Sequence, residues 1–135
     1  MDVAQALAEL TELSSQVRRA VVLDAEGALV GSTGEDSGAA ESLARAARDL
    51  VEAAADLRGS GNAVTRVEVE LEEGAVFVLR EGERTIAATT GPEPTAGLVA
   101  YDLRTCLKGI SESEPEKPKR RRAPRKTKAD EGTGE

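Results

Sequence analysis

The sequence predicts an α+β domain in which a helix, a β-hairpin, a second helix, a three-stranded meander and a third helix follow one another. Three observations support this order. Apolar residues recur at helical spacing near the start of the chain, alanine dominates residues 38–58, and valine alternates with charged residues over 64–72. Helices and strands repeat about every 3.6 and 2 residues, so periodicity separates the two kinds of element. A length of 135 residues favours one domain.

The first two elements are a helix and a hairpin. Residues 2–16 are expected to form the helix, because their apolar side chains fall on one side of it. Two short apolar runs follow at 20–23 and 28–30, on either side of an acidic turn that ends in Gly27. An acidic turn with glycine between apolar runs is typical of a β-hairpin.

A long alanine-rich helix is expected next, over residues 38–58. Asp36 or Ser37 can cap its amino end, because both side chains accept hydrogen bonds from the free N–H groups there. Gly59 is expected to stop the helix, since glycine readily adopts the left-handed conformation of a carboxyl-terminal cap.

Three strands of a meander are expected over the following segment. Strict alternation makes 64–72 the clearest strand, and tight turns containing Gly74 and Gly82 separate it from 75–80 and 83–90. The middle strand is nearly all apolar, which indicates an interior position in the sheet.

The final helix is expected over residues 95–110, after a segment with two prolines. Its apolar stripe consists of Val99, Leu103, Cys106, Leu107 and Ile110. The chain beyond it has no apolar residue larger than alanine and cannot bury enough surface to offset the entropy of ordering. We therefore expect a domain over 1–112 and a disordered tail over 113–135.

Charge divides the chain in the same way. Residues 1–114 contain 10 Lys/Arg and 21 Asp/Glu, a net charge of −11, whereas residues 115–135 contain 8 and 4, a net charge of +4. The acidic body is expected to repel nucleic acid and the tail to attract it. A single cysteine, no secretory leader pattern and no long apolar run together predict a cytoplasmic protein.

The composition argues against an enzyme. Histidine, the commonest general base and metal ligand, is absent from the sequence. Cys106 lies on an apolar stripe and is expected to be a buried hydrophobe, and the glycines of segment 31–34 lack the lysine of a phosphate-binding loop. The alternating glutamates of 68–72 are expected to be a solvated face. We therefore predict no catalytic residue, no metal and no cofactor.

Three segments carry a resemblance to a known family: AVVLDAEGALVGST at 20–33, VTRVEVELEEGAVFVLREGERTIAATTG at 64–91 and AGLVAYDLRTCLKGI at 96–110. With the element order, they make residues 2–110 resemble the roadblock/dynein light chain family. The resemblance implies a five-stranded antiparallel sheet with two helices on one face and one on the other. It also implies homo- or heterodimers joined through edge strands, which regulate or tether small Ras-like GTPases or serve as scaffolds.

The long helix offers one predicted dimer surface. Its apolar residues span an arc of about 200° on a helical projection, whereas a helix on one sheet needs little more than about 100°. The part of the apolar arc that the sheet does not need consists of small side chains, which permit close approach of a second helix. The residues expected in this interface are Ala40, Ala44, Ala47, Val51 and Ala55. The alternative is that the extra alanines form no interface and lie in solvent, because alanine tolerates exposure.

Strand 64–72 offers the other predicted dimer surface, because the resemblance makes it an edge strand that invites pairing. A two-fold axis at Val67 would place Arg66 opposite Glu68 of a second copy and avoid adjacent like charges, with Val69 completing the interface. The alternative is a solvated acidic edge that keeps a monomer from aggregating.

The basic tail could bind polyanions. Its cations are Lys117, Lys119, Arg120, Arg121, Arg122, Arg125, Lys126 and Lys128. Flexible cations gain affinity for nucleic acid by releasing counterions, and they also bind anionic membrane surfaces. Docking on the acidic body, or no role beyond solubility, are the alternatives. The sequence thus predicts a dimeric, non-catalytic module that binds a small Ras-like GTPase, or else an adaptor tethered by its tail.

Overall fold

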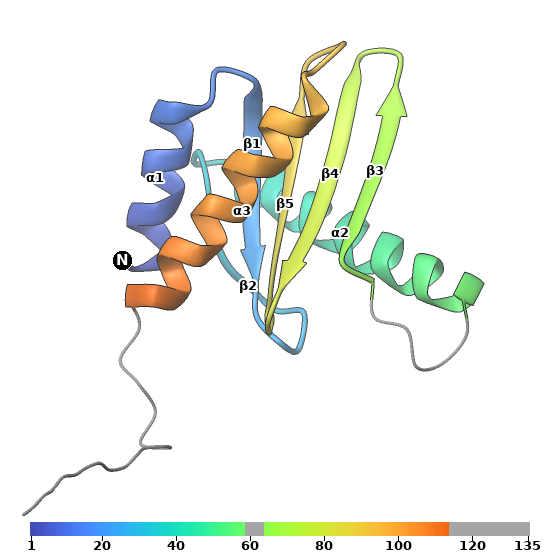
Figure 1. Cartoon of the computed structure of the whole chain (residues 1–135), viewed down its shortest axis with the longest axis horizontal. Coiled ribbons are helices and arrows are strands. Elements are labelled where there is room, and N and C mark those ends of the chain that lie inside the picture. The colour runs from blue at the N-terminus through green and yellow to red at the C-terminus, as the bar shows by residue number, and fades with distance from the viewer. Residues whose placement is uncertain (59–63, 114–135) are drawn as a thin grey trace, which may run out of the picture.

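The computed structural model describes residues 1–58 and 64–113. Its elements follow the predicted order: α1 (Val3–Leu13), β1 (Val17–Leu23), β2 (Leu29–Ser32), α2 (Ser37–Arg58), β3 (Arg66–Leu71), β4 (Gly74–Glu81), β5 (Arg84–Thr90) and α3 (Ala96–Ser113). The strands form one antiparallel sheet in the order β2-β1-β5-β4-β3. Helices α1 and α3 cover one face and α2 the other (Figure 1), which confirms the α+β class and its layers.

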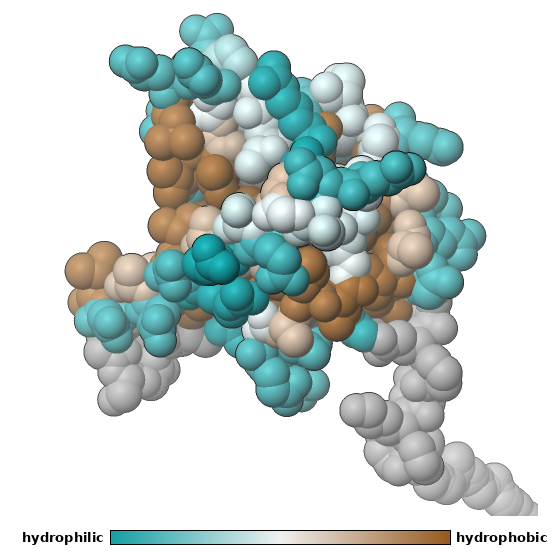
Figure 2. Space-filling model, turned by 180° about the vertical axis from the view of Figure 1, so that it is seen from behind, coloured by the Kyte–Doolittle hydropathy of each residue, from teal (hydrophilic) through white to brown (hydrophobic). Residues whose placement is uncertain are grey.

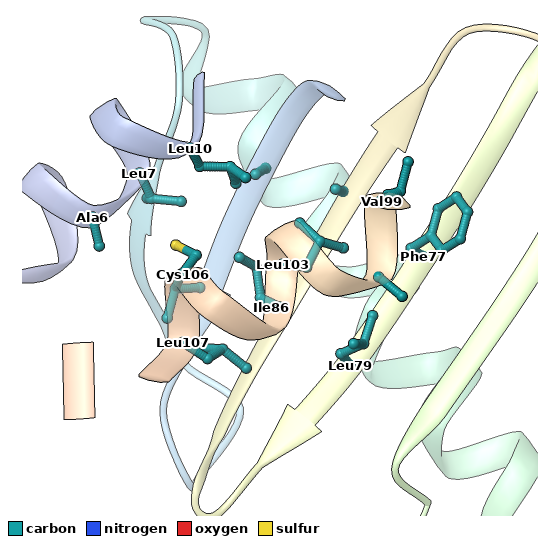
Figure 3. Packing of buried hydrophobic residues seen from close by; sticks show 14 of the residues in the cluster. Ala6, Leu7, Leu10, Phe77, Leu79, Ile86, Val99, Leu103, Cys106 and Leu107 are labelled. Carbon is teal, nitrogen blue, oxygen red and sulfur yellow. The ribbon is translucent and has the colours of Figure 1, made fainter. Parts of the chain in front are cut away.

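The larger core lies between the sheet and the pair α1 and α3. Phe77 of β4, Ile86 of β5 and Leu103 of α3 meet at its centre, all at most 1% exposed (Figure 3). Alternate residues of a strand point to opposite faces, so the near-continuous apolar run of β4 fills both cores. As predicted, β4 is an interior strand, between β3 and β5.

The smaller core lies between the sheet and α2. Val21, Val78 and Ala87 of three neighbouring strands face the alanines at the start of α2. Small side chains let a helix lie close to a sheet, because they fill little of the space between the backbones. Much of the wide alanine arc of α2 is therefore used within the monomer.

Two helix boundaries show what local chemistry decides. Asp36 caps α2, since its Oδ1 accepts a hydrogen bond of 3.0 Å from the N–H of Ala39. The first helix ends at Leu13, three residues before the predicted end, because Ser14 is extended. The Ser14 hydroxyl oxygen accepts hydrogen bonds from the backbone N–H groups of Gln16 and Val17, and these bonds direct the chain into β1.

The predicted turns differ in how they use glycine. Gly27 and Gly82 adopt φ of 85° and 63°, which glycine reaches without strain. Gly74, in contrast, is the first residue of β4, and a Cβ there would lie 2.1 Å from the carbonyl oxygen of Thr90. Helix α3 continues to Ser113, beyond its predicted end at 110, whereas the predicted stop at Gly59 lies outside the described residues.

Candidate functional site: the surface of β3 and α2

Strand β3 forms one edge of the sheet and pairs only with β4 among the described strands. The N–H of Arg80 donates a hydrogen bond of 3.0 Å to the carbonyl oxygen of Thr65. Along a strand of an antiparallel sheet, the backbone N–H and C=O groups of successive residues point alternately toward and away from the neighbouring strand. The backbone groups of Val67, like those of Thr65, therefore point toward β4, whereas those of Arg66 and Glu68 point outward. A strand edge with free backbone groups can pair with another strand.

The side chains of β3 separate by face. Val67 and Val69 are half-buried on the α2 side, opposite Val78 and Val76 of β4. Arg66 and Glu68 lie on the other side, where their side chains form an exposed ion pair. The strand thus presents an apolar row toward α2 and a charged row on the opposite face.

The outer end of α2 extends the apolar row. Figure 1 shows α2 crossing behind the sheet and running past β3. Leu57 at this end is 85% exposed, and Leu71 at the end of β3 is 57% exposed. Seen from behind, hydrophobic surface follows the β3 edge and the end of α2 (Figure 2). We call this the β3–α2 surface, made of Val51, Ala55, Leu57, Val67, Val69 and Leu71.

The structure corrects the predicted helix interface in part. Ala40, Ala44 and Ala47 are at most 1% exposed and pack inside the monomer's own smaller core, so they present no surface to a second copy. Val51 and Ala55 are half-buried near the β3 edge. The apolar arc predicted the burial of these alanines but could not tell which sector faces the sheet. Leu57 was missed, because its place beyond the sheet edge is a tertiary feature.

The described residues, 1–58 and 64–113, include no group of three or more Asp, Glu, His or Cys side chains that could hold a metal ion. The glycine segment that superficially suggests a phosphate loop begins inside β2. There a Cβ on Gly31 would lie 2.4 Å from Cγ1 of Val3, so this glycine permits α1 to pack closely. Its role is to permit the close packing of α1 on β2.

Cys106 is buried between α3 and α1, with its sulfur directed toward Leu7 and Leu10 (Figure 3). Burial, and to a smaller extent the Glu9 carboxylate, raises the pKa of its thiol from 9.0 to about 11. A thiol with a raised pKa holds little thiolate at neutral pH and is a poor nucleophile.

Folding stability is expected to decrease between about pH 9 and about pH 11 because of Cys106. The thiol ionises near pH 9.0 in the unfolded chain but only near pH 11 in the folded one, so its contribution is complete below pH 9 and is lost as pH rises through this interval. The loss is about 2 kcal/mol. Urea unfolding at both ends of the interval should show a smaller decrease for Cys106→Ala than for the wild type; equal decreases would contradict the assignment.

The basic run at 117–128 lies outside the described residues, so its polyanion binding stays a prediction from the sequence. In the part of the chain that the structure describes, no helix combines the length and the apolar character needed to cross a membrane.

A five-stranded sheet whose β3 edge is extended by an exposed apolar helix end defines a small α+β interaction domain. A family model described as Roadblock/LC7 domain matches residues 3–90, and the chain therefore belongs to the roadblock/LC7 family. Members of this family are regulatory or adaptor proteins rather than enzymes. The resemblance noted from the hairpin and the meander is thus confirmed.

Solved structures agree with this fold. A roadblock/LC7 domain from Streptomyces avermitilis is 24% identical, with a TM-score of 0.73, covering 83% of this chain and 97% of that one. A second structure from the same organism is 27% identical, with a TM-score of 0.64 and coverages of 78% and 95%. MglB from Myxococcus xanthus is 16% identical, with a TM-score of 0.56 and coverages of 83% and 93%. No curated protein sequence matches the chain significantly.

Proposed function

We propose that this chain is a non-catalytic regulatory module of the cytoplasm that dimerises through its β3–α2 surface and binds a small Ras-like GTPase through the helix and sheet surface of the dimer. The open β3 edge, flanked by exposed apolar side chains, is the observation that carries the proposal. An edge strand alone can be a hazard, but here Leu57 and Leu71 extend it into a surface that a partner can bury. The GTPase itself is suggested by membership in the roadblock/LC7 family.

The geometry of β3 supports pairing of two copies about Val67. The outward backbone groups of Arg66 and Glu68 would then bond with those of Glu68 and Arg66 of the second copy. Each Arg66 would lie between its own Glu68, with which it already pairs, and that of the second copy. Val67 would meet its counterpart on the α2 side and extend the smaller core across the interface. In a homodimer the two-fold symmetry forms this arrangement twice. A related subunit in place of the second copy would need a negative charge opposite Arg66 and a positive charge opposite Glu68.

Regulation would follow if the dimer holds the switch segments of the GTPase in one arrangement. An arginine could also stabilise charge on a transferring phosphoryl group. Arg48 donates a hydrogen bond of 2.7 Å to the carbonyl oxygen of Gly27, and Arg66 pairs with Glu68. Arg18 on β1 and Arg45 on α2 are both exposed and have no hydrogen-bond or ion-pair partner among the described residues, so both are candidates for this role.

The proposal is tested by measuring binding of the full chain to a purified small Ras-like GTPase from the same source, loaded with GDP or with a non-hydrolysable GTP analogue. We expect the two dissociation constants to differ by about tenfold or more, because a switch regulator must distinguish the two states. Equal affinity for both nucleotide states, or no binding to either, would contradict regulation through the switch segments.

A matched pair of variants locates the surface. Leu57→Asp places a charge on the β3–α2 surface and should weaken dimerisation, and with it GTPase binding, by about tenfold or more. Val30→Asp places the same charge on β2, at the opposite edge of the sheet, where the side chain is 45% exposed, and should leave binding unchanged. If Val30→Asp weakens binding and Leu57→Asp does not, the interface lies elsewhere.

A further inference from the structure

Helices α1 and α3 leave a groove between them, on the face of the sheet away from α2. The groove has a volume of about 710 Å³ and a floor that includes Leu10 and Cys106. Its walls carry three exposed apolar side chains: Leu13 is 74% exposed, Leu98 50% and Tyr101 64%. Most solvent-facing apolar residues are scattered, so three on one groove indicate a surface that another chain covers.

The exposed side of α3 supplies a segment that could lie in this groove. Leu98, Tyr101, Thr105 and Lys108 follow one another at spacings of three and four residues, and all are exposed and line the groove. Such spacing places them on one side of a helix. The chain therefore carries both an apolar groove and an amphipathic helix face that matches it.

That face is complementary to itself about Thr105. In an antiparallel pair of helices related by a two-fold axis at Thr105, residues three positions away on either side meet, so Asp102 faces Lys108 of the second copy. Residues four positions away also meet, so Tyr101 faces Gly109. A Cβ added at Gly109 would contact no atom within 4 Å, which leaves room for the ring.

We propose that a second copy of this chain occupies the groove, with the two α3 helices antiparallel and centred on Thr105. The arrangement forms two Asp102–Lys108 ion pairs and covers the exposed rings of Tyr101. Glu9 also lines the groove and adds a further carboxylate near the incoming lysine. This contact is separate from the β3–α2 surface, so a chain that uses both would assemble beyond a dimer.

Cysteine cross-linking of the full chain tests the centre of the contact. Helix axes packed about 8–10 Å apart bring facing Cα atoms within about 6 Å, which a disulfide can span. Thr105→Cys should therefore form a disulfide-linked dimer under mild oxidation. Arg104→Cys, on the adjacent flank of α3, is the matched control, and the wild type, whose one cysteine is buried, is the blank.

We expect Thr105→Cys to cross-link about tenfold faster than Arg104→Cys, because only residue 105 meets itself across the two-fold axis. Similar rates for the two variants would overturn the proposal. Neither outcome depends on the β3 edge or on a GTPase, so failure here and failure of the proposed function are distinguishable.

A charge exchange in the Thr105→Cys chain tests the register. Asp102→Lys alone places two ammonium groups together, and Lys108→Asp alone places two carboxylates together, so each should slow cross-linking by about tenfold. The double exchange restores opposite charges and should return the rate to within about threefold of the parent. No slowing in the single variants, or no recovery in the double variant, would overturn the pairing of Asp102 with Lys108.

Discussion

Replacing Glu68 by proline is expected to produce a folded chain that no longer dimerises through β3. The N–H of Glu68 points away from β4, as the ladder bond from Arg80 to Thr65 requires, so its loss removes no hydrogen bond within the sheet. Proline is tolerated at such outward positions of edge strands. The same N–H would donate a hydrogen bond to the carbonyl oxygen of Arg66 of a second copy. Because the dimer is two-fold symmetric, the substitution removes two such bonds.

Light scattering measures the effect on the full chain in an Asp102→Lys background, which removes the α3 contact and leaves β3 as the joining edge. We expect the mass of a dimer for this parent and of a monomer when Glu68→Pro is added, with unchanged circular dichroism in the far ultraviolet. A Glu68→Pro variant that keeps the dimer mass at the same concentration would show that β3 is not the joining edge, and the pairing about Val67 would then be wrong.

Val67→Pro is the matched control, one residue away. The N–H of Val67 points toward β4, so proline there removes a bond of the sheet and places its ring against the neighbouring strand. The expected loss in unfolding free energy is about 3 kcal/mol, a large part of the total for a small domain. If Glu68→Pro unfolds at the same urea concentration as Val67→Pro or at a lower one, the assignment of Val67 as inward and Glu68 as outward is wrong.

Gly74→Ala is expected to destabilise the fold strongly although it adds only a methyl group. The new Cβ would lie 2.1 Å from the carbonyl oxygen of Thr90, a backbone atom that cannot rotate away. Relief requires β4 and β5 to separate locally, at a cost of about 3 kcal/mol in unfolding free energy. Urea or thermal unfolding of the variant measures this cost.

Gly97→Ala provides the comparison, since Gly97 lies in α3 and an added Cβ meets no atom within 4 Å. Alanine is favoured over glycine in a helix, so this variant should be more stable by roughly 0.5–1 kcal/mol. Opposite signs for the two substitutions would support close packing at Gly74. A Gly74→Ala variant as stable as the wild type would contradict the packing of β4 against the end of β5.

Some of the candidate site could be predicted from local patterns. The alternation of valine and charge predicted β3, whereas the pairing of two copies about Val67 stays a prediction. Leu57 and the groove of Leu13 and Tyr101 were not predicted. Their exposure depends on where α2 ends relative to the sheet and on how α1 and α3 are placed relative to each other. The periodicity of a single segment carries no information on such packing.

The sequence by itself determined the kind and order of the elements, because helical and strand periodicities, caps and turn glycines act between residues close in the chain. It also determined that the core is aliphatic, because Phe77 and Tyr101 are the only aromatic residues of the chain. Only the tertiary structure decided that Ala44 faces inward, that β5 is the middle strand and that Gly74 must have no side chain. These features depend on contacts between segments far apart in the sequence, and the strand order that creates them leaves no local pattern.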